Sequence, residues 1–302
     1  MNVVDLFCGA GGESEGLRAA GARILAAVNH WPVAVASHLA AHPTTAHHCE
    51  DAAILDPTTL PAHDLLWASP SCTGHTRARG VDRPHHDTAR ATAWCVVRVA
   101  EIHRPAVIVV ENVTDFMRWE LYPAWRMALT LLGYRLGEHV INAADCGVPQ
   151  ERERLFVVGT RSKRPLELPR PTAARVGAAK VIDLGAGSWR PWASYAPLSV
   201  ARIRSAIRAQ GSICLVPYYG SPSSHAGRSL ARPIGTLTTR DRYVVVRGDE
   251  ARVLTVAEQL ALSGFPVGYP LTGTRREQVM QIGNAVCPPV ATWLAREIAR
   301  AA

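Results

Sequence analysis

The chain of 302 residues carries 33 lysine and arginine residues against 25 acidic ones, and its hydrophobic fraction is 48%. This length supports one large domain or two unequal ones, and the composition is that of a globular protein. No apolar run approaches the roughly 18 residues that a membrane helix needs, and the first residues lead directly into a strand-like segment. We therefore expect a cytoplasmic protein without a secretory signal or a membrane partner.

The formal net charge of +8 comes almost entirely from arginine, because Lys163 and Lys180 are the only lysines. Arginine suits bidentate contacts to phosphate and guanine better than lysine does. A genome rich in G and C would enrich arginine without any functional pressure. The charge therefore permits a nucleic-acid partner and does not establish one.

The seven cysteines are scattered without a C-x-x-C pair, which argues against a disulfide framework and a zinc ribbon. Two histidine-rich stretches, at 47–49 and 85–86, lack a second ligand pair at a recognisable spacing. We expect solvated loop histidines there and no metal.

Strand-like and helical segments alternate through the first half of the chain. Short apolar runs predict strands at 2–7, 24–28, 64–68, 106–111 and 155–160. Helical sequence from about residue 13 and at 32–41, 89–103 and 119–132 falls between them. This alternation is typical of a doubly wound α/β domain with a mainly parallel sheet.

After residue 160 the sequence becomes rich in proline and arginine, with short β-like runs at 213–216 and 243–246. This pattern predicts a smaller, loop-rich domain. Helical periodicity returns at 255–262 and 286–299. We expect a first domain at 1–160, a second at 161–254, and a C-terminal segment at 255–302 whose last helix packs back on the first domain.

The first predicted strand ends in the segment Asp5-Leu-Phe-Cys-Gly-Ala-Gly-Gly12 and opens into a helix. Glycines at such a turn let a cofactor approach the backbone, and a helix N-terminus favours an anionic group. The spacing differs from the G-x-G-x-x-G of a dinucleotide site, and an ordinary tight turn is the alternative.

Cys72 and Glu111 follow later strands, and ligands of open α/β sheets bind at the carboxyl ends of the strands. A thiolate can act there as a nucleophile and a carboxylic acid can protonate a ring nitrogen. An inert cysteine and a surface acid are the alternatives. Arg152 and Arg154 alternate on an incoming strand, so one can face a base or phosphate while the other braces the fold; a solvated charge run is the alternative.

Together these segments resemble the C5 cytosine methyltransferase family along nearly the whole chain. The segment 5–12 is similar to its cofactor-binding motif, Glu111-Asn-Val113 to its catalytic glutamate motif, and 143–154 to its arginine motif. Residues 232–239 resemble the segment that supports the target-recognition domain, and 254–266 and 283–286 resemble the closing region. The resemblance implies a methyltransferase-type, Rossmann-like α/β domain with a smaller target-recognition domain.

The resemblance implies a DNA (cytosine-5-)-methyltransferase with S-adenosylmethionine as cofactor. Cys72 would attack carbon 6 of a flipped cytosine, Glu111 would contact ring N3 and the exocyclic amine, and Arg154, with Arg152 near it, would bind the O2 side. The cofactor residues expected on this basis are Asp5, Phe7, Gly9, Ala10, Gly11, Gly12, Asn29, His30, Asp51, Ala52, Pro70, Asn284, Ala285 and Val286.

Two positions depart from the family pattern. The nucleophile motif Pro-Pro-Cys-Gln is replaced by Pro70-Ser-Cys-Thr73, which removes a rigid φ angle before the cysteine. Asn29 stands where an acidic residue usually holds the ribose hydroxyls, and His30 beside it is the residue we expect to stack on adenine. These departures raise the hypothesis of an unusual donor, transferred group or pyrimidine, which plain 5-methylcytosine at normal efficiency would exclude.

The resemblance further implies a double-stranded DNA partner, read by the smaller domain of a monomeric protein. The candidate DNA contacts are Arg202, Arg204, Arg208, Arg228, Arg240 and Arg242. A cognate restriction endonuclease is a possible partner, and solitary and phage roles fit the sequence equally. The alternatives are a tRNA cytosine-5 methyltransferase and a DNA-binding relative that has lost catalysis.

Overall fold

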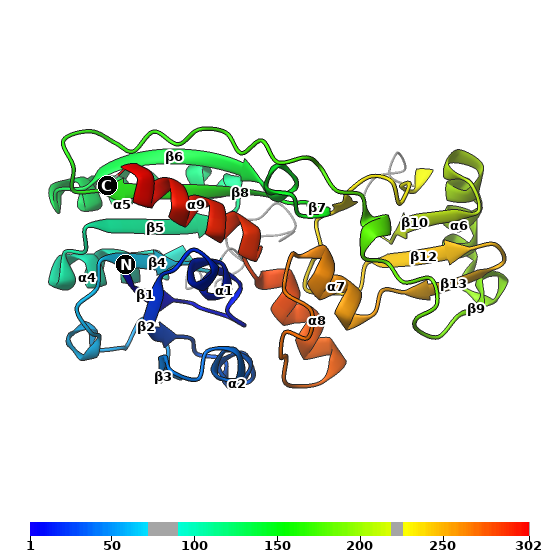
Figure 1. Ribbon diagram of the computed structural model, residues 1–302, viewed down its shortest axis with the longest axis horizontal. Coiled ribbons are helices and arrows are strands. Elements are labelled where there is room, and N and C mark those ends of the chain that lie inside the picture. Colours follow the sequence, from blue (N-terminus) through cyan, green and yellow to red (C-terminus); the bar gives the residue numbers. More distant parts are fainter. Residues whose placement is uncertain (72–89, 219–225, 302) are drawn as a thin grey trace.

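The computed structural model describes residues 1–71, 90–218 and 226–301. Two lobes lie side by side along the long axis of the molecule, with helices between them (Figure 1). The larger lobe holds a seven-stranded sheet and the smaller lobe holds a four-stranded sheet.

The seven-stranded sheet has the order β3-β2-β1-β4-β5-β8-β6. Its first five strands in this order run parallel, whereas β8 is antiparallel to both β5 and β6. This confirms the doubly wound, mainly parallel fold. The strands are β1 (Asn2–Leu6), β2 (Arg23–Val28), β3 (Ala46–His48), β4 (Leu65–Ala68), β5 (Val107–Asn112), β6 (Arg135–Asn142) and β8 (Glu153–Thr160).

The central strands are buried on both sides because helices cover both faces of this sheet. One face packs against α4 (Trp94–His103) and α5 (Tyr122–Leu131). The other packs against α1 (Gly12–Ala19) and the C-terminal helix α9 (Pro288–Ala301), as expected for the last predicted helix. The helix α2 (Pro32–Ala41) follows β2 and has the predicted bounds.

Glycine allows α1 and α9 to lie very close together. A Cβ atom on Gly16 would come within 2.2 Å of the carbonyl oxygen of Pro288, and one on Gly12 within 2.1 Å of that of Val286. Any side chain at these two positions would displace the backbone of the C-terminal segment. The C-terminal helix is therefore fitted onto the first helix of the chain.

The four-stranded sheet of the smaller lobe is antiparallel, with the order β10-β12-β13-β9. The 14-residue helix α6 (Pro197–Gln210) packs on it through Ile203 and Ala206. The sequence prediction of a loop-rich segment missed this helix. The strands are β9 (Arg190–Pro191), β10 (Ile213–Pro217), β12 (Tyr243–Arg247) and β13 (Glu250–Val253).

The helices between the lobes, α7 (Val256–Leu262) and α8 (Arg275–Asn284), share an apolar core with the smaller lobe. Within the 255–302 segment, α9 is the helix that packs on the large sheet. Leu166 and Leu168 lie after the expected boundary at residue 160 but pack against the core of the larger lobe. A short parallel ladder of β7 (Gln150–Glu151) and β11 (Ile234–Gly235) also links the lobes. The domain boundaries at 160 and 254 stay predictions.

Short 3-10 turns complete the described chain. They are η1 (Pro57–Thr59), η3 (Thr114–Arg118), η4 (Ala143–Cys146), η5 (Ala178–Lys180) and η6 (Trp192–Ser194).

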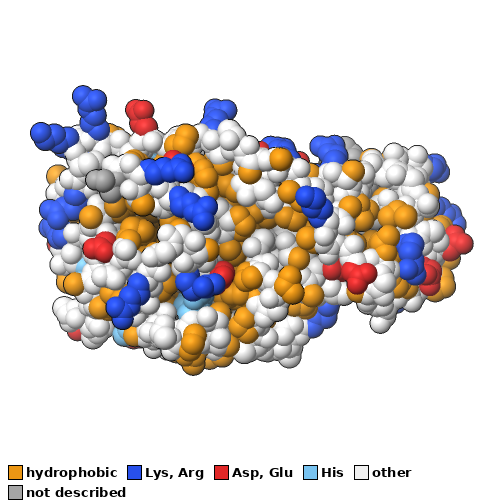
Figure 2. Space-filling view, viewed as in Figure 1, with side chains coloured by type: hydrophobic (Ala, Val, Ile, Leu, Met, Phe, Trp, Pro, Cys, Tyr) orange, Lys and Arg blue, Asp and Glu red, His pale blue; other side chains and the backbone are white. Residues whose placement is uncertain are grey.

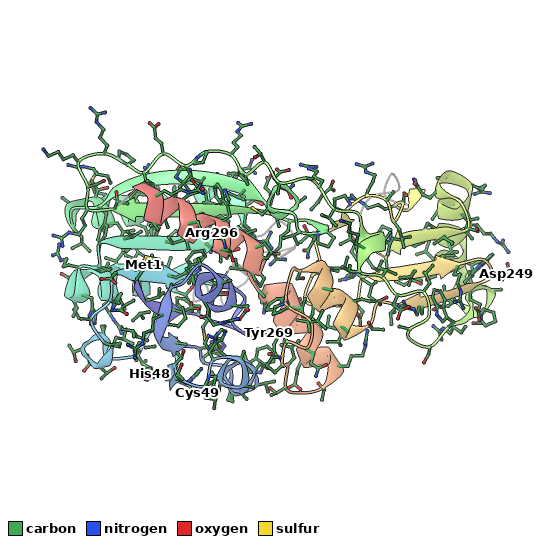
Figure 3. All side chains as sticks on the ribbon, viewed as in Figure 1. Met1, His48, Cys49, Asp249, Tyr269 and Arg296 are labelled. Carbon is green, nitrogen blue, oxygen red and sulfur yellow. The ribbon has the colours of Figure 1, made fainter. Side chains whose placement is uncertain are left out.

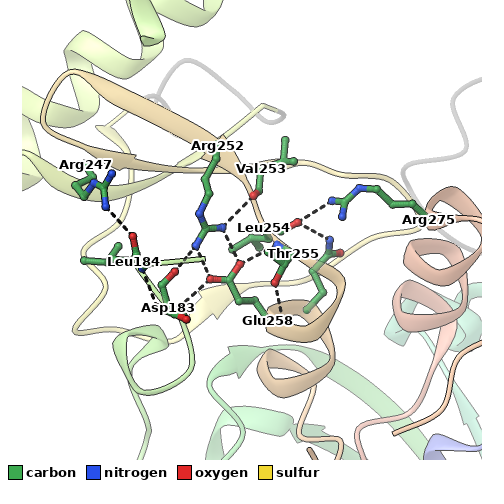
Figure 4. Close-up of polar contacts among 11 residues, drawn as sticks. Asp183, Leu184, Arg247, Arg252, Val253, Leu254, Thr255, Glu258 and Arg275 are labelled. Carbon is green, nitrogen blue, oxygen red and sulfur yellow. Dashed lines mark hydrogen bonds and ion pairs between the residues drawn. The ribbon is translucent and has the colours of Figure 1, made fainter. Parts of the chain in front are cut away.

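A buried ion pair joins the four-stranded sheet of the smaller lobe to α7 (Figure 4). Arg252 on β13 donates from both terminal nitrogens to Glu258 at 2.6 and 2.8 Å, and both side chains are almost fully buried. Arg252 also donates to the carbonyl oxygen of Asp183 at 2.6 Å. Glu258 in turn forms a capping box with Thr255 at the start of α7. The arginine thus fixes the sheet to the helix cap.

Candidate active site at the strand ends

A cavity of about 450 Å³ lies at the carboxyl ends of β1, β2, β4 and β5. It sits where the strand order reverses between β1 and β4, which is the place where open α/β sheets bind ligands. A larger groove of about 860 Å³ lies elsewhere, along α1 and α9, and Glu111 does not line it. The cavity wall consists of Phe7, Cys8, Gly9, Ala10, Glu13, Asn29, His30, Trp31, Ala34, Ser69, Pro70, Ser71, Glu111, Val113, Arg152, Arg154, Met280, Gln281, Gly283, Asn284 and Ala285.

The glycine segment after β1 presents backbone to this cavity. Phe7 has a φ of 63° and Gly9 a φ of 50°, so the chain turns through the left-handed region twice within three residues. The Tyr269 hydroxyl, at the junction of the lobes in Figure 3, donates to the carbonyl oxygen of Ala10 at 2.6 Å. A residue of the C-terminal half therefore holds the loop in place.

The last two glycines of the motif serve packing. A Cβ atom on Gly11 would lie 2.7 Å from the Tyr269 hydroxyl, and Gly12 packs against Val286. Neither glycine lines the cavity.

The segment that leads into Cys72 is anchored on two sides, although Cys72 and Thr73 lie outside the described residues. The side chain of Asn112, at the end of β5, donates to the carbonyl oxygen of Pro70 at 3.1 Å. The backbone N–H of Ser71 donates to the Thr92 hydroxyl at 3.2 Å. Pro70 and Ser71 are therefore held beside the end of β5.

Glu111 and Arg154 face each other across neighbouring strands. Arg154 Nε lies 3.2 Å from Glu111 Oε1, and the carboxyl is buried with 7% of the residue exposed. Burial raises the pKa of Glu111, while Arg154 and then Arg152 oppose that shift. Such a carboxyl keeps its proton to a higher pH than a surface glutamate and can donate it to a base.

Arg152 has a different place from Arg154. Its guanidinium is buried and donates to the carbonyl oxygens of Leu237 at 3.1 Å and Gly283 at 2.9 Å. Gln150 on the same segment accepts from the backbone N–H of Leu237 at 3.0 Å. Arg152 lines the cavity and also ties the arginine segment to both lobes.

Two further carboxyl groups lie beneath the glycine segment. Asp5 is completely buried and accepts a hydrogen bond from the Ser14 hydroxyl at 2.6 Å. Burial raises its pKa to about 7, and the Ser14 hydrogen bond acts in the opposite direction. Burial, and then the charge of Asp5, also raise the pKa of Glu13.

A chain of hydrogen bonds leads from Asp5 towards β3. His38 Nε2 lies 3.0 Å from Ser14 Oγ, and His38 Nδ1 lies 2.8 Å from His47 Nε2. Burial lowers the pKa of His38, so this ring is neutral. The expectation of a solvated loop histidine is therefore wrong for His47, because the residue belongs to β3 and its ring contacts His38 on α2. The other histidine-rich stretch, at 85–86, lies outside the described residues.

The end of β2 supplies another wall of the cavity. The Asn29 side-chain oxygen accepts from the backbone N–H of Trp31 at 2.9 Å, which starts α2 with an Asx turn. Asn29, His30 and Trp31 all line the cavity. Asp51 instead accepts from the backbone N–H of Ala53, at an exposed site, and does not line it.

The cavity brings together some of the predicted cofactor residues and leaves others in the surrounding structure. Those in its wall are Phe7, Gly9, Ala10, Asn29, His30, Pro70, Asn284 and Ala285; those outside it are Asp5, Gly11, Gly12, Asp51, Ala52 and Val286. Sequence reasoning missed Glu13, Ser69 and Ser71, although each one adjoins a motif residue. Met280 and Gln281 come from α8, a helix that the sequence analysis did not predict.

The candidate DNA-contact arginines occupy different settings. Arg202, Arg204 and Arg208 lie on α6, and the Arg204 guanidinium lies 5.8 Å from the Trp192 ring centre. Arg228 pairs with Glu151 at 2.6 Å and also donates to the carbonyl oxygen of Pro233. Lysine and arginine side chains are distributed over both lobes on the face shown in Figure 2.

Within residues 1–71, 90–218 and 226–301, no group of three or more metal-ligating side chains is placed to hold an ion. Over the same ranges, no helix combines the length and the apolar character needed to cross a membrane.

The fold and the site define a Rossmann-like α/β protein with a ligand cavity at its topological switch point. A sequence profile described as C-5 cytosine-specific DNA methylase matches residues 1–183 and 193–300. The chain belongs to this family.

Relatives in sequence agree with this assignment, and similar solved structures share the fold. Type II methyltransferase M.HgiDI of Herpetosiphon aurantiacus is 29% identical over 318 residues, which cover 99% of this chain and 94% of that protein. Type II methyltransferase M1.HphI of Haemophilus parahaemolyticus is 27% identical and covers 99% of this chain and 86% of the relative. An E. coli prophage-encoded protein described as a DNA modification methyltransferase shares the fold, with a TM-score of 0.75, 20% identity and 99% of each chain covered. So does a DNMT2 of Spodoptera frugiperda, with a TM-score of 0.72, 16% identity and coverage of 98% and 99%.

Proposed function

We propose that this chain transfers a methyl group from S-adenosylmethionine to carbon 5 of cytosine in double-stranded DNA. One observation carries the proposal: a buried Glu111–Arg154 pair opens into the same cavity as the glycine segment and the anchored stem of Cys72. An acid, an orienting cation and the residues that precede Cys72 in the wall of one cavity support this proposal.

The cavity fits the expected cofactor in size and in chemistry. About 450 Å³ lies within the range of small-ligand sites, and the exposed backbone at Phe7 and Gly9 allows close approach. His30 and Trp31 supply rings for the adenine, and Asn284 lies at the end of α8 on the opposite wall. S-adenosylmethionine supplies an activated methyl group on a cationic sulfur atom when it is bound.

The residues of the chain then have separate tasks. The Cys72 thiolate adds to carbon 6 of a cytosine that has left the base stack, which makes carbon 5 nucleophilic. Glu111 holds a proton at the position of ring N3, which its raised pKa favours, and Arg154 orients its carboxyl. Loss of the carbon 5 proton and elimination of the thiol restore the enzyme.

Recognition of the DNA sequence belongs to the smaller lobe in this proposal. Arg202, Arg204, Arg240 and Arg242 stay candidates for phosphate or guanine contacts. Arg228 is engaged with Glu151 and is a weaker candidate. The relatives M.HgiDI and M1.HphI carry the designation Type II, so we also propose that this protein acts beside a cognate restriction endonuclease. We further propose that it acts as a monomer.

Nucleoside mass spectrometry tests the proposal. Mixed-sequence duplex DNA and tRNA are incubated separately with the protein and S-adenosylmethionine, beside a Cys72→Ala control. We expect 5-methylcytosine in the DNA sample alone and none with the control. Product in tRNA alone refutes the DNA substrate, and product that survives Cys72→Ala refutes the nucleophile.

A further inference from the structure

Glu13 is a carboxyl group of the cavity wall to which the proposed mechanism gives no task. It occupies the first turn of α1, directly after the glycine segment, and only 2% of the residue is exposed. A buried carboxylate is costly unless a cation or several hydrogen bonds compensate for its lost hydration. Glu13 must therefore either keep its proton or, when it is ionised, gain a compensating charge.

The described neighbours of Glu13 supply hydrogen bonding and negative charge. The Ser69 hydroxyl accepts from the Trp67 indole N–H at 3.4 Å, so its own proton is free to donate to Glu13. The charged groups that act on Glu13 are Asp5 from β1 and Glu111 from β5. The groups that Glu13 affects in turn are Cys8, in the glycine segment, and Tyr269.

The arginines of the cavity are committed elsewhere. Arg154 pairs with Glu111, and Arg152 donates to two backbone carbonyl oxygens. The glycine-segment side of the cavity thus holds a buried acid whose local field is negative. A cationic group on the ligand is the partner that this environment favours.

We propose that Glu13 separates the methyl donor from its product, because its carboxylate pairs with the positive sulfur of S-adenosylmethionine, which the thioether of S-adenosylhomocysteine lacks. This inference rests on the proposed function. It assigns to Glu13 a role in specificity and in product release, because loss of the sulfur charge removes the attraction.

Donor binding also affects the proton of Glu13. Burial, and then the charges of Asp5 and Glu111, raise the pKa of Glu13 well above its ordinary value, so the free protein keeps a proton there to a higher pH than a surface glutamate does. A cation in the cavity stabilises the carboxylate, and the proton leaves to solvent when the donor binds. The affinity for the donor then rises with pH until the free carboxyl is already ionised, whereas the affinity for the product changes much less.

Isothermal titration of the wild-type protein tests this without any substitution. Each ligand is titrated at pH 6.5 in two buffers of different ionisation enthalpy, which gives the number of protons released on binding. We expect the donor to release more protons than the product. Equal proton release by the two ligands overturns the inference.

A matched pair of variants gives a second test at pH 8. Glu13→Gln keeps the size of the side chain, and Glu15→Gln changes the next acid on α1, which pairs with Arg18 and lies outside the cavity. For Glu13→Gln we expect the dissociation constant of the donor to rise about tenfold and that of the product by less than about threefold, since loss of roughly 1.4 kcal/mol is a factor of ten. Glu15→Gln should leave both constants unchanged.

The outcomes separate this inference from the proposed function. An equal loss of both affinities in Glu13→Gln means that the residue contacts a group common to both ligands, and the inference is wrong while the cofactor assignment stands. If the wild-type protein binds neither ligand, the proposed function itself fails. Circular dichroism checks that the variant folds, and if it does not, the proton release of the wild type decides.

Discussion

Replacement of Arg252 by methionine should strongly destabilise the smaller lobe. Methionine keeps an unbranched apolar stem and removes the cation that faces Glu258, a residue that is 4% exposed. Glu258 would then retain only the backbone N–H groups of Thr255 at 2.7 Å and Asp183 at 3.0 Å. The change leaves an unpaired buried carboxylate.

The magnitude follows from these contacts. Removal of one partner of a buried ion pair costs about 3–5 kcal/mol, and the cost should lie in the upper part of this range because Arg252 also donates to the carbonyl oxygen of Asp183. Arg247→Met is the matched control. Arg247 also lies over the Trp189 ring, but its partner Glu250 is exposed, and pairs of this kind contribute about 0–1 kcal/mol.

Urea unfolding followed by tryptophan fluorescence measures both variants, and the far-ultraviolet circular dichroism signal of the same samples follows the whole chain. We expect a large decrease in the midpoint for Arg252→Met and a small one for Arg247→Met. A double variant with Glu258→Gln should regain part of the loss, because it removes the unpaired charge. Equal effects of the two arginine substitutions would refute the reasoning that burial makes the Arg252 pair strong.

Further predictions concern the active site. Glu111→Gln should lower kcat by a factor of about 10² to 10⁴ because the amide cannot transfer a proton, and single-turnover methylation assays measure this. On the alkaline side of the pH profile, the wild-type kcat should fall as the pH rises through the raised pKa of Glu111, and a pH series of kcat that lacks this decline contradicts the assignment. Asn112→Ala should reduce kcat about tenfold through loss of the Pro70 contact, with little change in cofactor affinity by titration calorimetry. Arg152→Ala should lower the free energy of unfolding by about 1–3 kcal/mol, because two buried carbonyl oxygens lose their donor. Urea unfolding measures this change.

The sequence predicted four of the five parallel strands of the large sheet, because β1, β2, β4 and β5 are short apolar runs between turn residues. The strand β3, with the sequence Ala46-His-His48, forms no apolar run and was expected to be a loop. The sequence analysis missed β6, where exposed and partly exposed residues alternate around Gly137 and no apolar run forms. It also missed α6, because arginines interrupt the apolar periodicity of this helix and only the narrow stripe of Ile203 and Ala206 is buried. Such elements depend on the neighbours that they pack against, and local sequence does not show those neighbours.

The site shows the same limit. The alternation of Arg152 and Arg154 indicated that the two serve different purposes, but only the packing of 237 and 283 against the strand decides which one braces the fold. Gly11 and Gly12 belong to a recognisable motif, yet their lack of a side chain accommodates Tyr269 and Val286. Glu13 directly follows the glycine segment, and its place in the site becomes clear only because β4 and β5 bring Ser69 and Glu111 near it.

The close fit of α9 onto α1 has a consequence for how the protein forms during synthesis. The helix α1 leaves the ribosome long before α9, which packs on it. Until α9 emerges, the face of α1 that it covers is open, and the contacts of Tyr269 and Val286 with the glycine segment form only after these residues have been made. A nascent chain that has already completed its large sheet therefore still lacks a finished ligand site.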